Sequence, residues 1–485
     1  MKRFLPLILL ALAWHPARAQ FGFAQDNKPV NVTFPGSCDA QAPSSATATC
    51  TASGAGVTGD IVLVFTKAQN TSGTGVATMA ALTNCGPWVQ YAPVNTNGSG
   101  NAFNSTIRGC VLTAGTTPAP SVTWSSVNAT NTEIGVLIVH SSAGFGPTIL
   151  DRGITAVNGS STSSATGSTN ATRNPNTIVI GVSQTLATAE TWATAIPGYT
   201  RIAGAGSNHQ AVFYHQNTTI GIQSMTATLS SAAANEASLI ALQLGPNVNC
   251  SVQGCTFVQG TNSSGQSGTF DHITLSAVKN GSTLFYFVFH NTSSGSGTTT
   301  MSDSTGYNIW CAGDSSSNCS TPGGTVTMTD KQLSATYAMS VFYSKGVITG
   351  NGISGSVTGL PQASDCSVAC TFIGGFMIEM SGPFKWDSFV STATLTTSGV
   401  GTNNVGCGAL SASQPQDMIL MGVYNPANSV MSAGTSPITF TLPSITSQVN
   451  GQPEYGTWSG VGSTSPKATL VASATPYGAM CMMWQ

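Results

Sequence analysis

The sequence predicts an all-β protein with two tandem, jelly-roll-like β-sandwich domains that arose by internal duplication. Short apolar runs of strand length alternate with turns rich in Gly, Ser and Asn, and no stretch shows helical periodicity with caps. A second observation is a pattern that occurs twice: an apolar strand, a short loop, then Gly-Pro, two further residues, a bulky residue and Asp. It runs from Gly135 to Asp151 and again from Gly375 to Asp387.

The composition is the third observation. Hydrophobic residues make up 41% of the chain, enough for a packed core, whereas charged residues make up 6%, against about 25% in ordinary soluble proteins. Threonine supplies a β-branched polar face where other proteins place Lys and Glu. The net charge of -2 leaves no electrostatic footprint for nucleic acid or an anionic membrane.

The N-terminus has the pattern of a secretory signal peptide over residues 1–19. Lys2 and Arg3 form its basic region, Phe4 to Trp14 its apolar region, and Ala17-Arg18-Ala19 its cleavage site. The apolar run is short for a membrane span, and no later stretch is long enough to cross a bilayer. We therefore expect a secreted protein, extracellular or at the cell surface, with no membrane span in the mature chain.

The first domain is expected over residues 46–246, after a polar, Pro-rich lead-in over 20–45. Its first series of strands is expected at 61–65, 88–91, 105–111, 120–124 and 135–140. A second, similar series begins after Pro175, with strands at 177–182, 198–202, 210–215, 224–229 and 237–242.

The second domain is expected over residues 255–485, after a linker at 247–254. A third series repeats the first, with strands at 283–289, 307–310, 339–343, 353–357 and 375–380. A fourth repeats the second, with strands at 418–423, 468–471 and 478–484. The chain therefore reads as four similar series paired into two halves.

The cysteines predict a disulfide framework. All of them follow the signal sequence, and their even number in a secreted chain indicates disulfides. They are Cys38, Cys50, Cys85, Cys110, Cys250, Cys255, Cys311, Cys319, Cys366, Cys370, Cys407 and Cys481. Pairing of neighbours is the simplest arrangement and keeps every bridge inside one domain. The spacings do not match zinc sites, so no metal and no cofactor are expected.

The strand motifs resemble those of β-sandwich repeat modules in secreted bacterial proteins and phage fibre proteins. The resemblance lies in Pro175-Asn176-Thr177-Ile178-Val179-Ile180-Gly181-Val182, in the Gly198-Tyr199-Thr200 turn and in the closing alternating strands. Such modules carry no assigned activity. The resemblance implies a surface, adhesive or assembly role and supplies no catalytic residue.

No catalytic residue is predicted from the sequence itself. Gly352 to Ser356 lacks the last glycine of a hydrolase elbow. Glu379 is an acid inside an apolar strand, and burial would suit a general acid. Strand alternation instead predicts that it points to solvent. Asp151 and Asp387 are expected to bond backbone amides near their Gly-Pro turns.

Four aromatic residues could bind sugar rings. Trp88, Tyr91, Tyr307 and Trp310 occupy matching loop-to-strand positions in the two halves, and stacking of rings on a sandwich rim is one way to hold carbohydrate. The alternative is that they fill the cores of the sandwiches.

Three functions follow from these observations. The first is a non-enzymatic surface, adhesion or assembly protein, with self-assembly and cell-surface components among its partners. The second is a carbohydrate-binding, lectin-like protein that contacts extracellular polysaccharide. The third is a glycan-active enzyme, which the scarcity of acids disfavours because glycoside hydrolysis needs two facing carboxyl groups.

Overall fold

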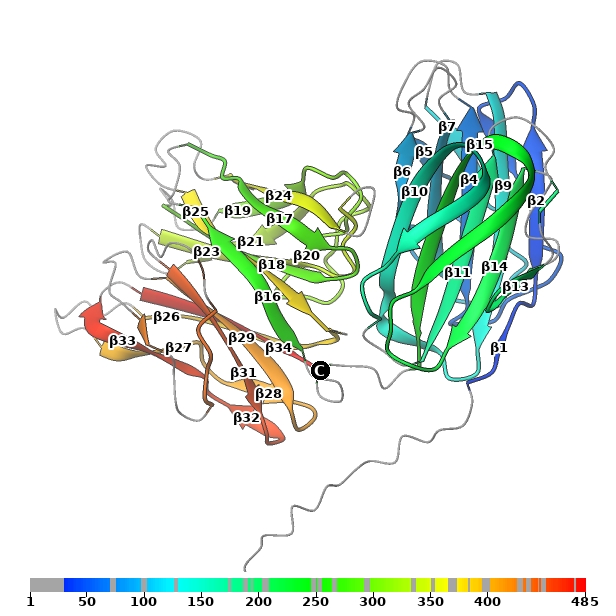
Figure 1. Cartoon of the computed structure of the whole chain (residues 1–485). Coiled ribbons are helices and arrows are strands. Elements are labelled where there is room, and N and C mark those ends of the chain that lie inside the picture. The colour runs from blue at the N-terminus through cyan, green and yellow to red at the C-terminus, as the bar shows by residue number, and fades with distance from the viewer. Residues whose placement is uncertain are drawn as a thin grey trace, which may run out of the picture.

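The computed structural model describes residues 30–485 apart from short gaps. The gaps are 70–75, 97–102, 126–129, 173–175, 186–190, 193–194, 203–208, 246–249, 251–254, 264–267, 292–296, 333–336, 350–353, 365–372, 383, 395–401, 425–430, 433–437, 444, 446–450 and 475–476. The named elements are all strands, paired into antiparallel sheets, so the all-β prediction is confirmed (Figure 1). The predicted signal peptide lies outside the described residues.

The first unit, residues 30–141, has a larger and a smaller sheet. The larger sheet has the order β1-β9-β4-β7-β6, with β2 also paired to β9. Its strands are β1 (Val32–Thr33), β2 (Ser37–Ala42), β4 (Ile61–Gln69), β6 (Val89–Thr96), β7 (Phe103–Val111) and β9 (Thr130–Ser141). The smaller sheet, β3-β8-β5, consists of β3 (Thr47–Thr49), β8 (Ser121–Trp124) and β5 (Ala77–Met79). Strands β1 and β2 thus lie inside the predicted lead-in.

The second unit, residues 145–245, forms one sheet of order β10-β15-β11-β14-β13-β12. Its strands are β10 (Phe145–Ser168), β11 (Thr177–Thr185), β12 (Ala195–Ile196), β13 (Tyr199–Arg201), β14 (Gln210–Asn217) and β15 (Ser224–Leu244). Met225 and Leu229, near the start of β15, pack in one cluster with Val179 and Phe213 of the sheet. The long β10–β15 ribbon therefore folds back and covers the outer face of its own sheet.

The third unit, residues 255–381, repeats the two-sheet arrangement of the first. Its larger sheet, β16-β25-β18-β23-β20 with β22 beside β23, consists of β16 (Thr256–Asn262), β18 (Thr283–Asn291), β20 (Cys311–Ala312), β22 (Lys331–Gln332), β23 (Tyr337–Ser344) and β25 (Ile373–Ser381). Its smaller sheet, β17-β24-β19-β21, consists of β17 (Ile273–Lys279), β19 (Thr298–Asp303), β21 (Val326–Thr329) and β24 (Ser354–Ala363).

The fourth unit, residues 384–485, has three small sheets. The first, β26-β34-β29-β31, consists of β26 (Trp386–Thr394), β29 (Asp417–Tyr424), β31 (Gly451–Trp458) and β34 (Tyr477–Trp484). The others are β27-β33-β30 and β28-β32, made of β27 (Thr402–Gly406), β28 (Leu410–Ala412), β30 (Met431–Ser432), β32 (Gly462–Thr464) and β33 (Lys467–Ala474).

The four units share one strand order in their larger sheets. It reads β2-β9-β4-β7, β10-β15-β11-β14, β16-β25-β18-β23 and β26-β34-β29-β31. In each unit the opening strand pairs with the closing strand, which pairs with the most buried strand. No described sheet joins a strand of the first two units to a strand of the last two.

Within each half, two larger sheets face each other and a further layer covers each of them. In β4, Ile61, Leu63 and Phe65 pack against the second unit, whereas Val62 and Val64 pack under the smaller sheet of the first unit. Because both faces are covered, β4 is apolar at successive positions and does not alternate. Each such side chain contributes about 1.5–3 kcal/mol by burial.

The two repeated aspartates lie at equivalent irregularities. On β10 the pairing with β15 shifts between Leu150 and Arg152, which leaves Asp151 as the extra residue. On β26 the pairing with β34 shifts between Trp386 and Ser388, which leaves Asp387 as the extra residue. A bulge of this kind re-aims the strand, so the conserved spacing of the sequence pattern marks a matching bend in units two and four.

The halves touch at the turn between β17 and β18. Asn280 donates from its side-chain amide to the Gly153 carbonyl oxygen at 3.4 Å. Gly281 has a φ of 90°, and a Cβ there would clash with the Asp151 carbonyl oxygen. Ile348 of the second half is buried in the core of the first.

The predicted disulfide pairing of neighbours is confirmed for every pair that lies within the described residues. These pairs are Cys38–Cys50, Cys85–Cys110, Cys250–Cys255, Cys311–Cys319 and Cys407–Cys481. The sixth predicted pair, Cys366 with Cys370, lies outside the described residues.

Candidate functional site

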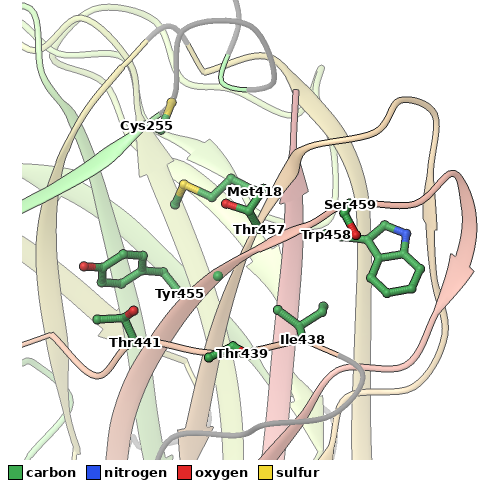
Figure 2. A pocket seen from close by; sticks show the side chains of 10 residues that line it. Cys255, Met418, Ile438, Thr439, Thr441, Tyr455, Thr457, Trp458 and Ser459 are labelled. Carbon is green, nitrogen blue, oxygen red and sulfur yellow. The ribbon is translucent and has the colours of Figure 1, made fainter. Parts of the chain in front are cut away.

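A pocket of about 420 Å³ opens where the larger sheets of the third and fourth units meet at their edges (Figure 2). Its volume is in the range of small-ligand pockets. The lining residues come from the position just before β16, from β29, from β31 and the residue after it, and from a segment beside β31. They are Cys255, Met418, Ile438, Thr439, Thr441, Tyr455, Gly456, Thr457, Trp458 and Ser459.

Strand alternation turns two side chains of β31 toward the third unit. Tyr455 pairs with Leu420 and Thr457 with Met418, on the face of the sheet that packs against the third unit. Trp458 points to the opposite face and packs against the outer core of the fourth unit. Figure 2 shows Tyr455 and Trp458 on opposite sides of the strand.

A short extended segment forms the other wall of the pocket. Thr441 exchanges two backbone hydrogen bonds with Tyr455, of 2.7 and 3.1 Å. Gly456 allows this approach, because a Cβ there would lie 2.8 Å from both the Ile438 Cγ2 atom and the Thr439 carbonyl oxygen. The pocket is thus bounded by hydroxyl groups and by the backbone of a sheet edge.

The pocket offers hydrogen bonds and apolar contact but no charge. No Asp, Glu, Lys, Arg or His is among its lining residues. The Tyr455 ring lies against Phe257 of β16, with ring centroids 6.0 Å apart and planes 16° apart. The pocket can therefore hold a neutral ligand.

One group of ionisable side chains in the first half lies inside its core, away from this pocket. Lys67 of β4 forms an ion pair with Glu133 of β9, with 3.1 Å between Nζ and Oε2, and both side chains are buried. The Lys67 ammonium also donates to the carbonyl oxygens of Thr185 and His209 in the second unit. Burial lowers the pKa of Lys67, and the nearby Glu133 carboxylate opposes that shift.

A second acid lies close to this pair. Ser105 donates its hydroxyl to Glu236 of β15, whose charge also acts on Lys67. Because these groups are covered by both sheets, a substrate has no access to them. We interpret the cluster as a polar connection between the first two units.

Glu379 is buried, so the expectation that it points to solvent is wrong. Alternation fails as a guide because β25 is covered on both faces, by the smaller sheet of its own unit and by the fourth unit. The Glu379 carboxylate accepts hydrogen bonds from the Gln259 side chain at 2.7 Å and from the Lys279 backbone N–H at 3.0 Å. The Glu379 carboxylate therefore acts as a hydrogen-bond acceptor within the fold.

The aromatic residues predicted as ligand contacts are mostly inside the cores. Trp88 is 8% exposed, Tyr91 2% and Trp310 0%. The indole N–H groups of Trp88 and Trp310 donate to the Ala80 carbonyl oxygen and to Asp303, respectively. Tyr307 is half-buried and packs against the core of the first half. These positions match the alternative of core packing, and ligand binding by these rings stays a prediction.

Asp387 accepts a hydrogen bond from the Ser413 backbone N–H at 3.0 Å and another from the Gln485 side chain at 3.2 Å. It thus bonds a backbone amide, but one distant in sequence and not in its own turn. Asp151 is buried beside Arg152, with 3.9 Å between Oδ1 and Nη1.

No pattern in the sequence indicates the pocket directly, because its walls come from the distant positions 255, 418, 438, 439, 441 and 455–459. A weak signal is present in Tyr455, an aromatic residue on a strand that follows turn-forming residues. Among the residues that the structure describes, no three His, Cys, Asp or Glu side chains are grouped to hold a metal ion. No helix in the described ranges is long and apolar enough to cross a membrane.

Comparison of the chain with protein-family models and with curated proteins finds no match.

Proposed function

We propose that this is a non-enzymatic extracellular protein that acts through its surface, in adhesion or assembly, and that it arose by duplication of β-sandwich modules. The observation that supports this most is the strand order shared by all four units. The matching bulges at Asp151 and Asp387 add a detail that strand order alone does not require. Repetition of one module is an economical way to present extended surface.

The positions of the acids support a non-enzymatic role. Glu133, Glu236, Glu379 and Glu454 are buried in the sheets, and the pocket described above has no acid in its lining. A glycoside hydrolase needs two carboxyl groups facing each other across the substrate. The disulfides are compatible with an oxidising, extracellular setting.

The test uses the mature chain, residues 20–485, with its disulfides formed. A panel of polysaccharides is incubated with the protein and assayed for released reducing ends, and the same protein is assayed for adsorption to cells and for self-association by sedimentation. We expect no release of reducing ends, together with adsorption or association. Hydrolysis that is lost in a Glu379→Gln variant would contradict the proposal, and so would a monomer that adsorbs to nothing.

A further inference from the structure

We propose that the pocket beside Tyr455 binds an extended peptide segment with apolar side chains at alternate positions. The reason is that the corresponding place in the first half is filled by such a segment of this chain.

The bulges at the repeated aspartates align the two halves residue by residue. Next to the Asp151 bulge, Leu150 pairs with Leu242, and next to the Asp387 bulge, Trp386 pairs with Trp484. Leu242 in turn pairs with Ile178, and Trp484 pairs with Met418. Ile178 of the first half therefore corresponds to Met418 of the pocket.

The same counting identifies the other pocket residues. Ile178 pairs with Gln216 on β14, and Met418 pairs with Thr457 on β31. Two positions earlier on those strands are Tyr214 and Tyr455. Each tyrosine ring lies against a phenylalanine from the start of the preceding unit, Phe34 at 4.7 Å and Phe257 at 6.0 Å between centroids. The crevice is thus the same structural position in both halves.

In the first half this crevice is occupied by residues 30–34. The Val30 carbonyl oxygen accepts a hydrogen bond of 2.6 Å from the side-chain amide of Gln216. Val30, Val32 and Phe34 pack against the central core, while β1 pairs with the end of β9. The occupant is therefore an extended chain whose alternate side chains are apolar.

In the second half no described residue before Cys255 lines this crevice. Phe257 stands at the position of Phe34, so Cys255, two residues before Phe257, stands at the position of Val32. Cys255 is bonded to Cys250, with a sequence separation of 5 and 5.0 Å between the Cα atoms, whereas five residues of an extended strand would span about 17 Å. Cys255 lines the pocket. The pocket therefore begins at the position that corresponds to Val32 in the first half.

The groups around the pocket suit a peptide. The hydroxyl of Thr457, at the position of Gln216, can donate to a backbone carbonyl oxygen of the ligand. Met418 and the face of Tyr455 offer apolar contact to a side chain at an alternate position. The absence of charge among the lining residues fits a ligand that presents backbone and apolar side chains.

The test measures binding of a labelled synthetic peptide with the sequence of residues 29–36, Pro-Val-Asn-Val-Thr-Phe-Pro-Gly, to the mature chain by fluorescence anisotropy. The informative variant is Thr457→Arg, because Thr457 is exposed and the larger, charged side chain would obstruct the pocket without disturbing a core. The matched control is Thr228→Arg, also at an exposed strand position. A second peptide of the same composition, in which the apolar residues are adjacent, tests whether binding requires apolar side chains at alternate positions.

We expect Thr457→Arg to weaken binding at least about tenfold, Thr228→Arg to leave it unchanged and the rearranged peptide to bind at least about tenfold more weakly. Binding that survives Thr457→Arg would overturn the assignment, because the peptide would then bind elsewhere, for example by displacing residues 30–34. Absence of peptide binding would overturn it too. A panel of neutral oligosaccharides is run in parallel, and a sugar that binds where the peptide does not, and is lost in Thr457→Arg, would assign the pocket to carbohydrate instead.

Discussion

Removal of the Lys67 ammonium should destabilise the first half strongly. In Lys67→Met the Glu133 carboxylate loses the ion pair of 3.1 Å while it stays at 0% exposure. The carbonyl oxygens of Thr185 and His209 also lose a donor from the facing sheet. Breaking a buried pair by removing one partner costs about 3–5 kcal/mol, a large fraction of the stability of an ordinary domain.

Removal of both charges should cost much less. The second half shows an apolar solution at the corresponding place, because Phe289 occupies the position of Lys67 and stacks on Tyr424 at 4.8 Å, with Gly374 opposite in place of Glu133. A Lys67→Met, Glu133→Met double variant should therefore recover most of the stability lost in the single variant, since apolar replacement of a buried pair is often neutral or favourable.

Urea denaturation of the four proteins in this cycle measures the coupling between the two side chains. We expect an unfolding transition of the first half that shifts markedly in each single variant and returns toward the original midpoint in the double variant. Single variants within about 1 kcal/mol of the parent would refute the reasoning, because the pair would then be solvated in solution.

The dependence on pH provides a second check of the same pair. Burial lowers the folded-state pKa of Lys67 below its ordinary value of 10.5. Between those two pKa values the unfolded chain holds a proton that the folded protein has released, so the free energy of unfolding rises with pH in that window. The difference in the free energy of unfolding between the parent and Lys67→Met should follow this rise and level off above pH 10.5. A difference that does not change with pH would contradict the lowered pKa of Lys67.

Four further predictions concern the second half and the disulfides. Glu379→Gln replaces one carboxylate oxygen by an amide NH2 group, which then faces one of the two donors that the carboxylate accepts from. The free energy of unfolding, measured by urea denaturation, should fall by about 1–3 kcal/mol. No change would show that the carboxylate is solvated. Replacing Cys407 and Cys481 by serine opens a loop with a sequence separation of 74 and should cost about 4 kcal/mol, seen as a lower melting temperature. Burial raises the pKa of Asp271 above 3.8, so stability should fall as pH rises from 3.8 to the folded pKa, and Asp271→Asn should abolish that fall. Thiol titration of the denatured, unreduced protein should find close to no free thiol.

The sequence predicted the most buried strands well because their patterns are unusual. The apolar runs over 61–65 and 177–182 predicted strands, and in the structure both faces of each are covered. The same feature explains the failure at Glu379, where alternation assumed one solvated face. A buried acid cannot be told from an exposed one by its neighbours when the layer above the strand comes from a distant part of the chain.

The pocket could not be predicted, because it lies at the place that residues 30–32 fill in the first half, and no described segment fills that place in the second half. The Phe257–Tyr455 contact repeats the Phe34–Tyr214 contact, but nothing local distinguishes the filled crevice from the open one. The difference lies in the short Cys250–Cys255 bridge, which holds Cys250 beside Cys255. The sequence also could not decide between core packing and ligand contact for the aromatic residues, since a tryptophan before a strand serves either role.

The layered arrangement of each half also determines how small a folded fragment can be. The strands β4 and β11 lie between an outer layer and the sheet of the neighbouring unit, so a single unit expressed alone would expose one face of its most apolar strand to water. Each pair of units should therefore open as one cooperative block. Backbone amides of β4 and β11 would exchange with solvent deuterium at a common, slow rate set by the opening of residues 30–245, while the edges of the small outer sheets exchange independently and sooner.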